Sequence, residues 1–242
     1  MNKNKLFRII LLLARPAAGK SEIIQYLQSL TLKDRINRFH LGRIHVIDDF
    51  PMIWTWFEED GLLTQMGFPR IYTDENGYFL QQYLWDLLIE RMNIEYTKFK
   101  RDDNNFEDHT VIIEFSRGKE HGGYKSAFSH LSDELIHSAA ILYINVSWEE
   151  SLRKNRKRFN PEKPDSILEH SLPDEKLTKM YYETDWNEIS AKNNEFIKVG
   201  SSLVPYSIFE NEDDVTSGKI HELDKRLQST LDSLWNNYNI RN

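Results

Sequence analysis

The chain of 242 residues contains no cysteine, which excludes disulfide bonds, thiolate zinc sites and a cysteine nucleophile. It also contains no apolar run approaching the roughly 18 residues of a membrane-spanning helix. Basic residues precede the apolar run at 9–14, as in a signal peptide, but a secretory segment needs about 7 to 15 apolar residues, and this run ends at Arg15-Pro16. We therefore expect a protein that is neither exported nor inserted in a membrane, with the cytoplasm as its default location.

The chain has no excess of positive charge. Its formal net charge is −7 and its pI is near 5.7, so no general field attracts nucleic acid or anionic lipid, and we expect neither as a partner. Its eight histidines include no pair at metal-ligand spacing, so we predict no zinc site. The sequence gives no indication of the oligomeric state.

Short apolar runs alternate with segments of helical period along the whole chain, and 40% of its residues are apolar. This pattern is typical of a parallel sheet covered by helices on both faces. It predicts an α/β fold with a five-stranded parallel sheet, in a single domain over residues 1–242. The expected strands lie at 6–13, 43–47, 110–115, 139–146 and 204–209.

Two long insertions interrupt the alternation, one at about 50–100 and one at about 148–192. The first begins with an aromatic segment that contains the turn signals Asp60-Gly61 and Asn76-Gly77, and continues as an amphipathic helix. The second is helical. A final helix is expected over 220–235.

The segment Ala14-Arg15-Pro16-Ala17-Ala18-Gly19-Lys20-Ser21 fits the phosphate-binding loop pattern, with alanine at its first position. It joins an apolar strand to an amphipathic helix, so backbone N–H groups and the helix dipole converge on one anion site. Gly19 permits a close backbone approach, Lys20 neutralises phosphate oxygens and the Ser21 hydroxyl can ligate Mg²⁺. ATP and Mg²⁺ are the implied cofactors. The residues expected to bind the nucleotide are Arg15, Pro16, Ala17, Ala18, Gly19, Lys20 and Ser21.

With this loop the chain resembles the P-loop kinase superfamily, particularly its nucleoside, nucleotide and other small-molecule kinases. Ile47-Asp48-Asp49-Phe50 is similar to the element that ends the second strand in uridine kinase and glycerate kinase relatives, although Pro51 stands where a tyrosine is usual. The resemblance implies a three-layer P-loop NTPase sandwich with a helical lid. It also implies that Asp48 faces the acceptor hydroxyl.

Carboxylates end two of the expected strands, where ligands of open α/β sheets bind. We predict Asp48 as the base or substrate-orienting group, with Asp49 as its alternate and as a substrate contact, and Glu114 as a ligand of magnesium or of its water shell. The alternative is that these residues cap helices or turns. Arg117 lies three positions after Glu114, where related kinases carry an arginine that meets substrate or phosphate; the alternative is a surface ion pair.

A basic cluster at 153–158 resembles the lid of nucleotide kinases, in which arginines close over the transferring phosphoryl group. Helical spacing favours Arg153 and Arg156 for this catalytic role, and a solvated helix face is the alternative. In the aromatic segment, Phe50 and Trp54 are candidate substrate contacts, although most rings there are expected to belong to the core.

These features together predict an ATP- and Mg²⁺-dependent kinase that acts on a small molecule, with a nucleoside or nucleotide as one candidate class. The main alternative is a nucleotide-binding regulatory NTPase without a small-molecule acceptor. The chain lacks the Asn-Lys-x-Asp element of GTPases, and that alternative leaves the aromatic insertion unexplained. A binding module without activity is a third alternative, which the presence of both Lys20 and Ser21 disfavours.

Overall fold

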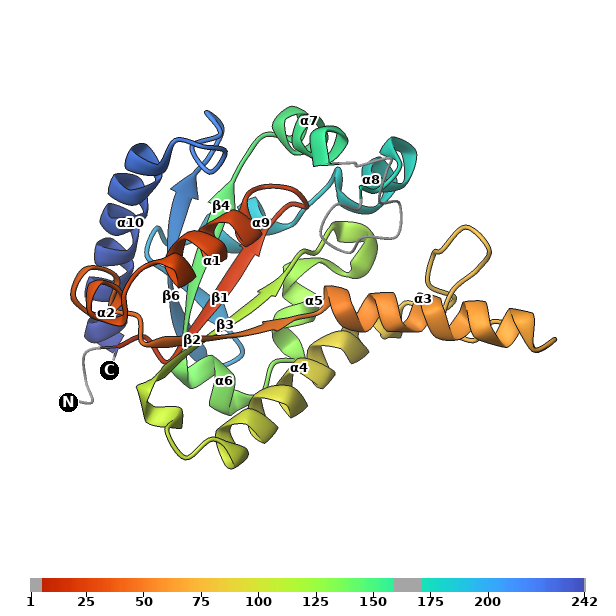
Figure 1. The fold of residues 1–242 in the computed structure, drawn as a ribbon, viewed down its shortest axis with the longest axis horizontal. Coiled ribbons are helices and arrows are strands. Elements are labelled where there is room, and N and C mark those ends of the chain that lie inside the picture. Colours follow the sequence, from red (N-terminus) through yellow and green to blue (C-terminus); the bar gives the residue numbers. More distant parts are fainter. Residues whose placement is uncertain (1–5, 159–170, 242) are drawn as a thin grey trace.

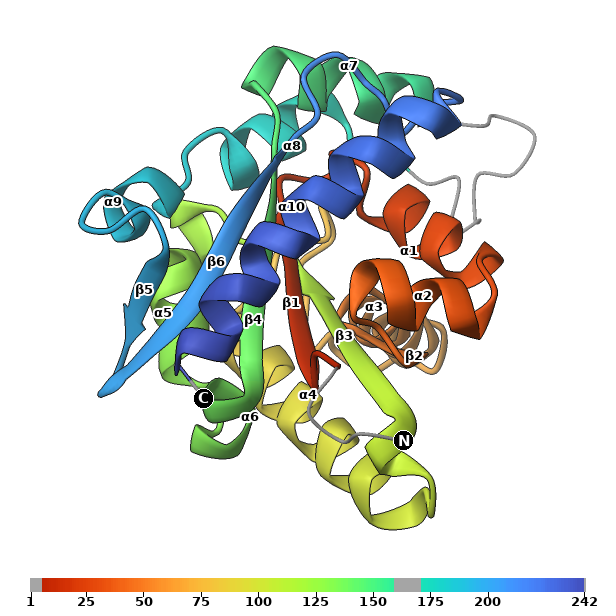
Figure 2. The same ribbon diagram turned by 90° about the vertical axis from the view of Figure 1, so that its left-hand side faces the viewer.

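The computed structural model describes residues 6–158 and 171–241. In it a six-stranded sheet forms the middle layer and helices cover both faces, as Figures 1 and 2 show from two directions. The strand order is β2-β3-β1-β4-β6-β5. The strands are β1 (Ile9–Ala14), β2 (Arg43–Asp48), β3 (His109–Phe115), β4 (Ala139–Asn145), β5 (Phe196–Val199) and β6 (Ser202–Glu210).

The expected sheet of five parallel strands is wrong in its strand count and in its uniform direction. Five strands pair in parallel, but β5 pairs antiparallel with β6 at one edge of the sheet. A two-residue turn at Gly200 and Ser201 joins them, and Gly200 has a φ of 57°. With four residues after a polar stretch, β5 is too short for its periodicity to be read from the sequence.

One face of the sheet is covered by α1 (Lys20–Ser29), α2 (Leu32–Phe39) and α10 (Ile220–Arg241). Side chains of β1, β3 and β4 pack against these helices in one core, and α10 contributes a leucine at each turn. The amphipathic helix expected directly after the loop at 14–21 corresponds to α1, and the helix expected at 220–235 corresponds to α10.

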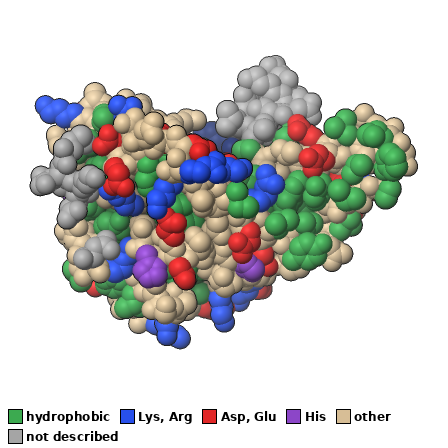
Figure 3. All heavy atoms as spheres, turned by 90° about the horizontal axis from the view of Figure 1, so that it is seen from below, with side chains coloured by type: hydrophobic (Ala, Val, Ile, Leu, Met, Phe, Trp, Pro, Cys, Tyr) green, Lys and Arg blue, Asp and Glu red, His purple; other side chains and the backbone are tan. Residues whose placement is uncertain are grey.

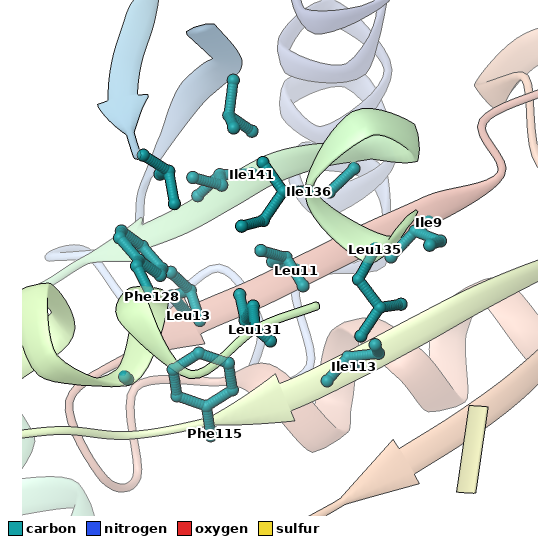
Figure 4. Close-up of a cluster of buried hydrophobic side chains, with 14 of the residues drawn as sticks. Ile9, Leu11, Leu13, Ile113, Phe115, Phe128, Leu131, Leu135, Ile136 and Ile141 are labelled. Atoms are coloured by element: carbon teal, nitrogen blue, oxygen red, sulfur yellow. The ribbon is translucent and has the colours of Figure 1, made fainter. Parts of the chain in front are cut away.

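The opposite face is covered by α4 (Tyr83–Asp102), α5 (Gly123–Ser129), α6 (Asp133–Ser138) and α9 (Trp186–Ser190). Figure 4 shows this second core, where side chains of β1, β3 and β4 meet those of α5 and α6. Successive residues of β1 belong to the two cores in turn, because side chains alternate between the faces of a strand. Two short 3₁₀ helices, Phe106–Asp108 and Lys119–His121, flank β3.

The aromatic segment forms a third, smaller core outside the sheet. It packs α3 (Phe50–Gln65) and the start of α4 against α8 (Asp174–Tyr181). The turn expected at Asn76-Gly77 is confirmed, since Gly77 has a φ of 72° between the bridged residues Thr73 and Phe79. The turn expected at Asp60-Gly61 is wrong, because both residues lie inside α3.

The outer end of this insertion carries exposed apolar side chains, which gather on the right-hand side of Figure 3. The large apolar residues of this insertion that are exposed include Leu62, Met66, Phe68, Ile71, Leu80 and Tyr83.

The helical insertion expected at 148–192 contains α7 (Trp148–Arg158), α8 and α9, and its residues 159–170 lie outside the described part of the chain. In Figure 1, α7 and α8 lie above the upper ends of the strands. No helix within 6–158 and 171–241 is both long and apolar enough to cross a membrane.

Candidate active site

The loop between β1 and α1 has the backbone that a phosphate cradle requires. Gly19 is left-handed, with φ 112° and ψ 16°, and Ala17 has a φ of 57°, which is uncommon for a residue with a side chain. The helix α1 begins directly after Gly19, so its positive end faces the loop. Ala14, which stands at the first motif position, is the last residue of β1 and is fully buried, and its carbonyl accepts a hydrogen bond from Tyr124 (3.0 Å).

A second loop, residues 211–217 after β6, packs against the phosphate loop and is hydrogen-bonded to it. Asn211 donates to the carbonyl of Ala18 (2.8 Å) and to the Thr216 hydroxyl (2.9 Å). The buried Lys154 of α7 donates to the same hydroxyl (3.0 Å) and to Asp214 (2.7 Å). These contacts of Asn211 were not predicted from the sequence, although Asn211 directly follows β6, and a polar residue at a strand end was the signal that identified Asp48 and Glu114.

Two adjoining cavities open on either side of Lys20. The first, of about 310 Å³, is lined by the phosphate loop, by Lys157 and Arg158 of α7, and by the second loop. The second, of about 150 Å³, is lined by strand-end carboxylates and by apolar side chains of α3 and α8. Lys20 and Ser21 line both cavities, and Lys20 donates a hydrogen bond to the Ser116 hydroxyl after β3 (2.8 Å).

The predicted acidic residues meet in the second cavity. Asp48 and Glu114 are register partners at the ends of β2 and β3, and both line the cavity with Asp49. Burial, followed by the charges of Glu114 and Asp49, raises the pKa of Asp48 to about 7, against the hydrogen bond that the Phe50 N–H donates to Asp48 (3.0 Å). Burial also raises the pKa of Glu114, although the charge of Lys20 opposes this.

Arg117 lies behind the wall of this cavity and not on it. It is buried, forms an ion pair with Asp49 (2.5 Å), and donates to the carbonyls of Ser116 (2.8 Å) and Trp85 (3.3 Å). The carboxylate and the two carbonyl groups offset the cost of removing the Arg117 charge from water, so the side chain can be buried. The expected contact of Arg117 with substrate stays a prediction.

The expected lid arginines lie apart from both cavities. Arg153 is held by Glu150 (2.7 Å) and Asp214 (2.8 Å), and Arg156 pairs with Asp174 at the start of α8 (2.6 Å). The basic side chains of α7 that do line the first cavity are Lys154, Lys157 and Arg158. Helical spacing alone did not identify them, because it does not fix which face of α7 meets the loop. The catalytic roles of Arg153 and Arg156 stay predictions.

The other predicted contacts take different positions. Phe50 lines the second cavity, and Trp54 packs one turn behind it, with ring centroids 6.0 Å apart. The backbone of Arg15 belongs to the phosphate loop, but its side chain donates to the carbonyls of Tyr181 and Tyr182, which ties the loop to α8.

The donor set of the site fits magnesium better than zinc. Mg²⁺ prefers oxygen ligands, keeps several waters and is often held by one or two protein groups plus substrate phosphates. The Ser21 hydroxyl and the Glu114 and Asp48 carboxylates border one cavity. No group of three or more histidine or acidic side chains in the described ranges is arranged around a metal-sized space. The metal would therefore depend on the bound phosphates for its remaining ligands.

Comparison with known proteins adds little to this geometry. No protein-family model matches the chain. No curated protein matches it in sequence. Among solved structures, it is similar to an unliganded sugar kinase from Janibacter sp., with 13% identity, 95% of this chain and 97% of that chain covered, and a TM-score of 0.42. A likeness this weak carries no information about activity, so function has to be inferred from the site itself.

Proposed function

We propose that the chain is an ATP- and Mg²⁺-dependent phosphotransferase of the P-loop kinase superfamily that acts on a small molecule. The observation that carries this proposal is the position of Lys20 on the wall common to two cavities. One cavity has the lining of a phosphate site, and the other has the lining of a site for a hydroxyl acceptor. A hydrolase would need the first cavity but not the second.

The donor phosphates would bind in the first cavity. There the backbone of residues 15–19, the positive end of α1 and the Lys20 ammonium group favour a polyanion. Lys157 and Arg158 add positive charge from the opposite wall, where charge that develops during transfer would be offset. Arg153 and Arg156 are proposed to reach this place only through a movement of α7.

The acceptor hydroxyl would lie against Asp48. A general base works best when its pKa is near the working pH, and the pKa of Asp48 is raised to about 7 by burial and neighbouring carboxylates. In the protonated state Asp48 can orient the acceptor, and in the ionised state it can take the hydroxyl proton. Asp49 is less suited to this role because it is paired with Arg117.

Ser21 and Glu114 would hold the magnesium ion. When bound, the ion neutralises charge on the phosphate oxygens. The chain itself contributes alignment, since β1, β2 and β3 fix Lys20, Asp48 and Glu114 relative to one another through the sheet register.

The test is ADP formation from ATP and Mg²⁺ with a panel of nucleosides, nucleoside monophosphates, sugars and small hydroxy acids. We expect one class of acceptor to stimulate ADP release and the Lys20→Ala variant to lose at least about 100-fold of that rate, as removal of a charge-stabilising group does. Lys33→Ala, at an exposed position on α2, is the matched control and should retain full activity.

Two other outcomes would count against the proposal. Nucleotide binding without any stimulating acceptor would favour a regulatory NTPase. Equal ADP release by wild type and the Lys20→Ala variant would show that the phosphate loop is not the reaction site.

A further inference from the structure

The acceptor cavity is lined by more carboxyl groups than the phosphate cavity. Its ionisable lining includes the carboxyl groups of Asp48, Asp49 and Glu114. Among the described residues that line it, the positive charges are those of Lys20 and Arg158, and both also line the phosphate cavity. Bound nucleotide phosphates would therefore engage the same two cations.

The buried cation Arg117 does not line this cavity. The Arg117 side chain is 2% exposed, and its guanidinium group is occupied by Asp49 and by the carbonyls of Ser116 and Trp85. Within residues 6–158 and 171–241, an anionic acceptor would thus face Asp48 and Glu114 without a positive partner of its own. Juxtaposed like charges are a strong means of rejecting a ligand.

The remaining lining suits a ligand that donates hydrogen bonds. Carboxylate oxygens accept them from hydroxyl or ammonium groups, whereas both polar atoms of Asn155 are already bonded to the backbone of Leu172 (2.8 and 3.2 Å). Phe50, Ile53 and Tyr181 supply apolar walls. A volume of about 150 Å³ holds a molecule of roughly the size of benzene, so the enclosed part of the acceptor is about one ring.

From this charge distribution we infer that the acceptor is a small neutral or cationic alcohol, such as a sugar, a cyclitol or an amino alcohol, and not a phosphorylated or carboxylated compound. The inference rests on the proposed kinase function and narrows it, since nucleoside monophosphates are excluded as acceptors.

The test compares pairs of acceptors that differ in charge but offer the same free hydroxyl groups, under saturating ATP and Mg²⁺ at about 0.15 M salt. The pairs are 5-deoxyribose with ribose 5-phosphate, 6-deoxyglucose with glucose 6-phosphate, and ethanolamine with glycolate. For each pair that reacts, we expect kcat/KM to be at least about 100-fold higher for the member without the anionic group.

A positive charge introduced at the cavity wall tests whether the charge of the lining causes the preference for acceptors without an anionic group. Phe50→Arg adds a cation at a half-buried lining position, and Phe50→Gln is the matched control that removes the ring without adding charge. We expect the preference for the uncharged member to fall at least about tenfold in Phe50→Arg relative to Phe50→Gln.

The outcomes separate this inference from the proposed function. Equal or better turnover of the anionic members, or an unchanged preference in Phe50→Arg, would overturn the inference and leave the kinase in place. ADP release that no acceptor raises above the rate in water would overturn both.

Discussion

Gly19 occupies a position where both the backbone conformation and the close neighbours disfavour any side chain. Its φ of 112° disfavours any residue with a Cβ atom, and an added Cβ would lie 2.8 Å from both the Asn211 amide nitrogen and the Thr216 hydroxyl. The glycine therefore allows the phosphate loop to rest directly on the loop that follows β6.

Gly19→Ala is expected to lower the free energy of unfolding by about 1–3 kcal/mol, through backbone strain and the clash with Asn211 and Thr216. Urea unfolding measures this. Gly218→Ala is the control, because Gly218 also has a positive φ (84°) but no neighbour within 4 Å, so only the conformational cost applies. Equal losses in the two variants would contradict the close contact.

Burial of Asp48 gives it the raised pKa that suits the proposed base, but the buried carboxylate also lowers the stability of the fold when it is ionised. Its pKa of about 7, against an ordinary value of 3.8, means that between these pH values the folded chain holds a proton that the unfolded chain has released. The stability of the ligand-free protein should therefore decrease as the pH rises from about 4 to about 7, and then change no further from this group.

Asp48→Asn should remove that dependence, since asparagine keeps an acceptor for the Phe50 N–H but carries no charge. At pH 8 we expect the variant to be more stable than wild type by on the order of 2 kcal/mol, with the difference vanishing near pH 4. Thermal unfolding across this range measures it, with Asp133→Asn at an exposed position of α6 as the control. A difference independent of pH would show that Asp48 is not buried with a raised pKa.

At the scale of the element, the long helix α3 keeps its place through one buried carboxylate. Asp60 is fully buried and accepts hydrogen bonds from the backbone N–H groups of Ile71 (2.7 Å), Tyr72 (3.2 Å) and Thr73 (2.6 Å). Burial alone would raise its pKa, but these hydrogen bonds lower it below the ordinary value. Asp60, which the sequence predicted to lie in a turn, thus holds residues 71–73 against the side of α3.

Asp60→Asn replaces one acceptor oxygen with an N–H₂ group that would face backbone donors. We expect it to lower the free energy of unfolding by about 1–3 kcal/mol, which is the cost of leaving a buried polar group unsatisfied. Chemical denaturation measures this, and Glu58→Gln, at an exposed position of the same helix, should change stability little. If both variants retain wild-type stability, Asp60 does not anchor the loop.

At the scale of the whole molecule, the residues of the candidate site lie together at the carboxyl edge of the sheet. The phosphate loop follows β1, Asp48 is the last residue of β2 and Glu114 the penultimate residue of β3. Helix α7 follows β4, and residues 211–217 follow β6. Because β1 lies between β3 and β4 and the helices following β1 and β3 pack on opposite faces, a crevice is expected at this carboxyl edge. Both cavities lie there.

Features that depend on neighbouring residues were predictable from the sequence. They are the loop that joins the first strand to the first helix at 14–21, the positions of Asp48 and Glu114 near strand ends, and the leucine period of the last helix, because each follows from local geometry and side-chain period.

Which charged side chains are paired with one another depends on the tertiary structure. Arg117 is paired with Asp49, 68 positions away, and Lys154 is buried against a loop 60 positions further along the chain. The tertiary structure also decided that the segment 196–199 joins the sheet as β5, because its pairing depends on β6. Pairings between distant segments depend on how the layers stack and which helix face turns inward, and the local pattern of residues does not encode this stacking.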